Sequence, residues 1–178
     1  MSIISKVITL GRILIPTIES DHQWIHEGRT FSLGYEFTLS GATPQYLHLV
    51  LDKPIHLHGV KIVCELDDNL ITLLQDPVMN LDASPDEVPF LNNNRMIPNN
   101  SVAKAYSNST YVSGGTVLCG HHIYGVEGRG AFQPVGGFSE GPWEWVLNPA
   151  YEYAFKVERP GETGTAKVAL ELMYYYLD

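Results

Sequence analysis

The chain has 178 residues, of which 11 are basic and 20 acidic, and its formal net charge is −9 at neutral pH. A chain of this length suits one domain, which buries roughly 70% of the surface that its unfolded form exposes. The acidic balance repels a phosphate backbone and an anionic lipid surface. We therefore expect neither nucleic acid nor a membrane among its partners.

The first residues predict an N-terminal strand. Residues 2–15 alternate loosely and contain many β-branched residues, with a break or bulge at Gly11. A short helical turn is the alternative. The segment lacks the basic start, long apolar centre and cleavage site of a signal peptide, and no run approaches the roughly 18 to 20 apolar residues that span a bilayer. We expect synthesis in a cytosol.

A polar connection at residues 16–29 leads to a series of short strands, each bounded by turn residues. The strands are predicted at 30–40, 45–51, 55–66 and 70–75. The composition then changes, because prolines and asparagines dominate residues 77–113. Few apolar residues there recur with the period of a strand or of a helix. This composition predicts a long loop or insertion, of the kind that forms lids or contact arms.

Strand character returns at residues 114–124 and is followed by a glycine-rich loop at 125–142. Phe132 and Phe138 in this loop are expected to be exposed unless another element or molecule covers them. The last segment, 145–178, predicts a hairpin, which consists of a strand, a turn and a strand. Its final strand is apolar on nearly both faces, as expected of a strand inside a sandwich. About eight strands without a defensible long helix predict an all-β fold: a single-domain β-sandwich or jelly roll over residues 1–178.

Cysteine and histidine give a weak metal hypothesis. His56 and His58 share one strand face, as in metal-binding cupins, but the cupin glutamate and glycine are missing. A composite site with Cys64, Cys119 and His121 would require the two strands to pair. Two free buried thiols are the preferred interpretation of the cysteines. We predict no metal, no cofactor and no catalytic residue.

The remaining candidates are acidic turns and aromatic side chains. Asp82, Asp86 and Glu87 do not follow the spacing of a calcium-binding EF-hand loop and are interpreted as solvated turn residues. Aromatic rings can stack on sugars, which leaves carbohydrate binding as an alternative to a protein interface. The rings in question are Tyr106, Tyr111, Tyr124, Trp143, Trp145 and the C-terminal tyrosines.

Three blocks of sequence carry a resemblance to a known family. They are HEGRTFSLGYEF at 26–37, SGGTVLCGHHIYG at 113–125, and EWVLNPAYEYAFKVER with KVALELMYYYLD at 144–159 and 167–178. These blocks resemble small virion structural proteins of tailed bacteriophages, which share an EGR-x-F start, a central GGT strand and a similar aromatic ending. The likeness covers both ends of the chain and little of residues 66–110.

The resemblance implies a non-enzymatic jelly-roll capsid decoration or cement protein. It would bind the outer surface of the major capsid protein lattice as a homo-oligomer, with a trimer favoured, and reside on the capsid exterior after synthesis in the bacterial host. A carbohydrate- or receptor-binding module is the alternative function. The expected contact elements are residues 1–15, 77–110 and 125–142, and the expected contact residues are Ile3, Ile4, Val7, Ile8, Met96, Ile97, Phe132 and Phe138.

Overall fold

The computed structural model describes the backbone of residues 6–10, 13–17, 20–64, 69–97, 99–123 and 145–176. Side chains are described for residues 23–64, 69–97, 99–120 and 145–176. The glycine-rich loop at 125–142 therefore lies outside the described residues.

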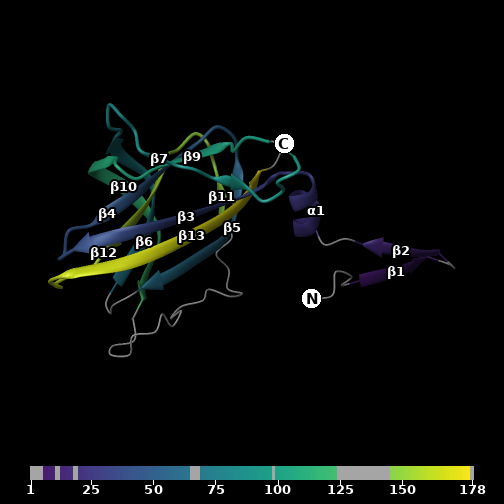
Figure 1. The fold of residues 1–178 in the computed structure, drawn as a ribbon, viewed down its shortest axis with the longest axis horizontal. Coiled ribbons are helices and arrows are strands. Elements are labelled where there is room, and N and C mark those ends of the chain that lie inside the picture. Colours follow the sequence, from purple (N-terminus) through teal and green to yellow (C-terminus); the bar gives the residue numbers. More distant parts are fainter. Residues whose placement is uncertain are drawn as a thin grey trace.

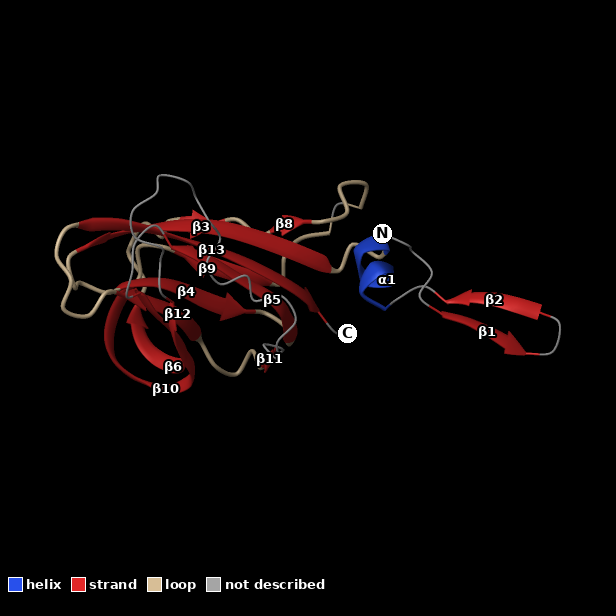
Figure 2. Cartoon of the chain, turned by 90° about the horizontal axis from the view of Figure 1, so that it is seen from below, coloured by secondary structure: helices blue, strands red, loops and turns tan. Residues whose placement is uncertain are grey.

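Two antiparallel sheets pack face to face as a β-sandwich, which confirms the predicted all-β fold (Figures 1 and 2). We name each sheet after its central strand. The β13 sheet has the order β11-β5-β13-β3-β8, and the β12 sheet has the order β10-β6-β12-β4-β9-β7. The main strands of the first sheet are β3 (Thr30–Ser40), β5 (Ile55–Cys64), β11 (Trp145–Leu147) and β13 (Thr165–Tyr176). Those of the second are β4 (Gln45–Leu51), β6 (Asn69–Asn80), β10 (Thr110–Ile123) and β12 (Tyr153–Glu158).

These eight strands follow a jelly-roll order. Successive strands alternate between the sheets, except that β6 and β10 pair with each other in one sheet. The order β3-β13-β5-β11 thus faces the order β4-β12-β6-β10, which is the arrangement of two Greek keys in a jelly roll.

The last two strands correct one expectation. The sequence predicted that 145–178 would form a strand-turn-strand hairpin, but β12 and β13 lie in different sheets. The turn at Pro160 and Gly161 crosses from one sheet to the other. The second expectation for this segment is confirmed, because β13 is the central strand of its sheet, between β3 and β5.

The segment 77–113 also differs from the predicted loop. It contains the end of β6, the start of β10 and three short strands between them, which are β7 (Glu87–Val88), β8 (Leu91–Asn92) and β9 (Ala103–Tyr106). β8 extends the β13 sheet beyond β3, whereas β9 and β7 extend the β12 sheet beyond β4. The insertion therefore covers one edge of each sheet.

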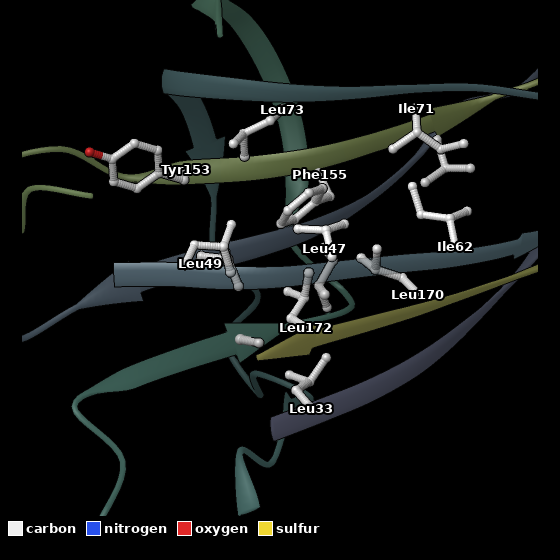
Figure 3. Close-up of a cluster of buried hydrophobic side chains, with 14 of the residues drawn as sticks. Leu33, Leu47, Leu49, Ile62, Ile71, Leu73, Tyr153, Phe155, Leu170 and Leu172 are labelled. Carbon is white, nitrogen blue, oxygen red and sulfur yellow. The ribbon is translucent and has the colours of Figure 1, made fainter. Parts of the chain in front are cut away.

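The core lies between the two sheets, where the inward-facing residues of each strand meet (Figure 3). Alternation along the strands directs every second side chain into this space. Phe155 and Leu73 come from the β12 sheet, and Leu170 and Leu172 come from β13. Each is buried, so the period of two in the sequence identifies the core-facing side of these strands.

The N-terminal part lies outside the sandwich. β1 (Lys6–Leu10) and β2 (Ile13–Thr17) form an antiparallel hairpin, where the sequence predicted one interrupted strand. The predicted polar connection at 16–29 contains a helix, α1 (Ser20–His26). Among the described residues no helix is long and apolar enough to cross a membrane. Both views show the hairpin beyond α1 and away from the two sheets (Figures 1 and 2).

Candidate partner-contact surface

The hairpin of β1 and β2, which we call the arm, is the main candidate contact element. Its two strands have their main contacts with each other among the described residues. The arm sequence contains Val7, Ile8 and Leu14, yet a two-stranded hairpin alone is marginally stable in water. An apolar hairpin held away from its own core is typical of a segment that packs against another molecule.

Stacked rings join α1 to the sandwich. The ring of Trp24 in α1 lies 3.6 Å from the ring of Tyr175 in β13, with an interplanar angle of 23°. The Tyr175 hydroxyl in turn forms a hydrogen bond with Nδ1 of His56 in β5. Because β5 and β13 are neighbouring strands, these contacts fix α1, which follows the arm in the sequence, to the end of one sheet.

Three asparagines of the insertion bind the backbone at the end of α1. Asn94 Nδ2 donates to the carbonyl oxygen of His26 at 2.9 Å. Asn92 Nδ2 and Asn99 Nδ2 both donate to the carbonyl oxygen of Gly28, at 3.0 and 3.2 Å. The carbonyl groups at a helix end lack partners within the helix, so Asn94 satisfies one of them at His26, and the bonds to Gly28 hold the chain directly after α1. The composition that predicted a loop thus marks the asparagine clamp, as we call Asn92, Asn94 and Asn99.

Gly28 allows the asparagine-rich turn to pack closely against the backbone after α1. Its φ is +69°, a region that favours glycine, and a Cβ added there would lie 2.9 Å from Cγ2 of Ile97. The backbone of residue 28 therefore lies directly against the Ile97 side chain.

The predicted contact residues divide into four groups. Met96 lies at the tip of the asparagine-rich turn with 92% of its side chain exposed, as expected of a contact residue. Ile97 is half-buried against Gly28 and supports the turn from inside, so the structure gives it an anchoring role. Val7 and Ile8 lie in β1. Ile3, Ile4, Phe132 and Phe138 lie outside the described residues.

The strand pairing that a composite metal site with Cys64, Cys119 and His121 would require is absent from the described strands. Cys64 lies on β5 of one sheet and Cys119 on β10 of the other, so the two strands do not pair. Both cysteines are free thiols, and burial raises the pKa of Cys64 to about 12. Within the described part of the chain, no three histidine, cysteine or acidic residues gather closely enough to hold a metal ion.

One buried polar cluster was not anticipated from the sequence. His48 of β4 contacts Ser109 Oγ through Nδ1 and Glu152 Oε2 through Nε2, both at 3.0 Å. A carboxylate only accepts hydrogen bonds, so Nε2 of the neutral ring carries the proton and Nδ1 accepts from the Ser109 hydroxyl. Burial lowers the pKa of His48, although Glu152 opposes this effect. Since His48 and Ser109 are both buried, the cluster ties the β9–β10 turn to the sandwich.

The aromatic residues do not form one exposed platform among the described residues. Tyr111 stacks on Tyr46 with ring centroids 4.9 Å apart, Tyr106 is half-buried near His48, and Trp145 packs against the core. Tyr124 and Trp143 lie outside the described residues.

A shallow groove of about 500 Å³ lies on the outer face of the β13 sheet. Gly34 pairs with Glu171 and Gly59 with Met173 of the central strand. A Cβ added at Gly34 would meet nothing within 4 Å, whereas one added at Gly59 would lie 3.5 Å from Cβ of Met173. None of the described residues that line this groove is aromatic.

The fold and the projecting arm define the chain as a jelly-roll β-sandwich with an appended N-terminal contact element. Comparison with protein-family models, with curated protein sequences and with solved structures found no match.

Proposed function

We propose that this protein is a non-enzymatic virion component that binds the outer surface of a capsid lattice and stabilises the head. The sequence blocks described above motivate the class, and the major capsid protein would be the partner. The proposal places the protein on the capsid exterior as a homo-oligomer, with a trimer favoured.

The position of the arm is the observation that carries the proposal. The arm lies outside the jelly roll (Figure 2), and the helix that follows it in the sequence, α1, is held by the Trp24 and Tyr175 stack and the asparagine clamp. A jelly roll with an apolar arm that extends beyond it is suited to fastening one molecule to its neighbours. On a symmetric lattice many such contacts act together, so each one can be weak while the whole attachment is strong.

Met96 adds a second element at the same end of the molecule. The clamp that holds α1 is formed by the turn that exposes Met96, because Asn94 both accepts from the Met96 N–H and donates to His26. A partner that binds α1 would therefore also contact the Met96 side chain.

Co-sedimentation with capsids that lack the protein tests the proposal. We expect the intact chain to sediment with capsids, and a variant without residues 1–17 to remain in the supernatant. Met96→Glu is expected to weaken binding, whereas Leu81→Glu, at another exposed apolar residue, serves as the matched control. Binding by the deletion variant equal to that of the intact chain would remove the arm from the proposal. A failure of the intact chain to bind capsids, together with strong binding on a glycan array, would favour the carbohydrate-binding alternative.

A further inference from the structure

The four edges of the jelly roll are protected to very different degrees. The β8 and β9–β7 strands of the insertion cover the β3 and β4 edges, and the edge strand β11 is only three residues long. β10 is different, since it has 14 residues and forms the outer edge of the β12 sheet, paired with β6 among the described strands. It is the one long edge strand in the described part of the molecule.

β10 also lacks two of the features by which proteins block an exposed edge, namely charged residues and prolines. Charged residues, above all lysine, and prolines normally prevent another strand from pairing there. The sequence of β10, TYVSGGTVLCGHHI, contains neither a charged residue of the Asp, Glu, Lys or Arg type nor a proline. Val112 and Val117 are 51% and 61% exposed along it. An uncharged edge with exposed valines is suited to accept an added strand.

Two bulges divide this edge into regular stretches. The register with β6 shifts between Tyr111 and Ser113 and again between Val117 and Cys119. The register is unbroken over 113–117 and over 119–123, and each stretch matches the five residues of β1 in length. Gly114 and Gly115 have positive φ, so 119–123 is the stretch with regular strand backbone. Within the arm, Pro16 removes one backbone donor from β2, whereas β1 has an N–H at every residue. β1 is thus the better strand to add to β10.

Charge favours another copy of this chain as the partner. Residues 1–17 contain Lys6 and Arg12 and no acidic residue, so the rest of the chain holds nine basic and all 20 acidic residues. The arm is basic and the remainder strongly acidic, which draws the arm of one copy toward the body of another. The uncharged β10 lets the two backbones approach without placing like charges opposite each other.

From these observations we infer that copies of this protein exchange arms, with β1 of one copy adding as an antiparallel strand to the open β10 edge of the next. The exchange extends the β12 sheet across two molecules and buries the apolar arm. It rests on the proposed function only in taking the arm as a contact element, and it names the arm's partner. The contact is head-to-tail, so it closes into a ring when the rotation between copies permits, as in a trimer.

Sedimentation of the purified full chain over a concentration series tests the inference without capsids. We expect the intact chain to associate and the variant without residues 1–17 to be a monomer. Val117→Lys on β10 should abolish or strongly weaken association, because a lysine on the edge opposes strand addition. Val146→Lys is the matched control, since Val146 is 64% exposed on the short edge strand β11 of the other sheet, and it should leave association unchanged.

Cross-linking between copies provides the second measurement. In a Cys119→Ser background, a Thr9→Cys chain is mixed with a Thr116→Cys chain and treated with a short bismaleimide. We expect a linked dimer of the two chains, and none when Thr116→Cys is replaced by Thr165→Cys at the far start of β13.

Three outcomes would overturn the inference. The first is that the intact chain is a monomer at every concentration, and the second is that the Val117→Lys and Val146→Lys variants associate equally. The third is that the variant without residues 1–17 still associates and that adding Val117→Lys to it abolishes this association. The last result would indicate that two β10 edges pair directly. Because no capsid is present, none of these results decides whether the protein binds capsids.

Discussion

Trp24 and Tyr175 stack at 3.6 Å although one lies in the helix before the first strand of the sandwich and the other in its last strand. The contact joins α1 to the last strand of the sandwich. Together with the asparagine clamp it holds α1 by side chains from three distant parts of the sequence.

Removing the Trp24 ring should release α1 while leaving the jelly roll folded. An aromatic stack of this kind contributes about 0.5–1.5 kcal/mol beyond the area that it buries. We expect Trp24→Ala to lower the free energy of unfolding by at least about 1 kcal/mol and to speed hydrogen exchange of the α1 amides. Trp24→Phe keeps a ring at the site and should retain most of the protection. Unchanged exchange in Trp24→Ala would show that the clamp alone holds the helix.

Gly28→Ala should destabilise the clamp more than a comparable glycine elsewhere. The φ of Gly28 is +69° and the added Cβ would meet Ile97. Gly41 also has a positive φ, of +61°, but its nearest neighbour to an added Cβ is 3.8 Å away. Both substitutions carry the backbone cost of about 1–2 kcal/mol. The clash should make Gly28→Ala worse by about another 1–3 kcal/mol in denaturant unfolding, and equal effects of the two variants would contradict this account of the clamp.

Acid should weaken the fold through His48. Its pKa in the folded state is lowered by burial, so the unfolded chain takes up a proton at a higher pH than the folded chain does. Stability is therefore present above the ordinary histidine pKa of about 6.5 and falls as the pH drops below it. His48→Gln should flatten this part of the curve of unfolding free energy against pH. A variant with the same slope as the parent chain would assign the effect to other groups.

Tyr174→Phe should cost stability despite its conservative shape. The Tyr174 hydroxyl accepts from the Val102 N–H at 3.2 Å and contacts Ser101 Oγ at 2.6 Å. Burial raises the pKa of this tyrosine to about 12. Deleting the hydroxyl leaves a buried donor unsatisfied, for which we expect a loss of about 1–3 kcal/mol in thermal or denaturant unfolding. Tyr151→Phe, at a residue that is 40% exposed, should change stability little.

Periodicity in the sequence predicted the strands more accurately than their partners. β3 and β4 have the expected bounds because turn residues enclose each alternating run. The period of two also indicated the buried face of β13. It does not indicate which sheet a strand joins, so the predicted pairing of β12 with β13 was wrong.

Sequence patterns could not predict the short elements or the contacts between residues that are far apart in the chain. β7 and β8 have two residues each and α1 has seven, too few to display a period. The partners of His48 lie 61 and 104 residues away along the chain. The asparagine clamp could be noticed only as an unusual composition, since its function depends on carbonyl groups that the fold brings to it.

Imaging of virus particles assembled with and without this protein tests the central claim most directly. The account predicts added density on the outer surface of the head at positions repeated by the capsid symmetry, with each jelly roll joined to its neighbours through its arm. Density confined to the tail, or heads that are identical in the two preparations, would contradict it.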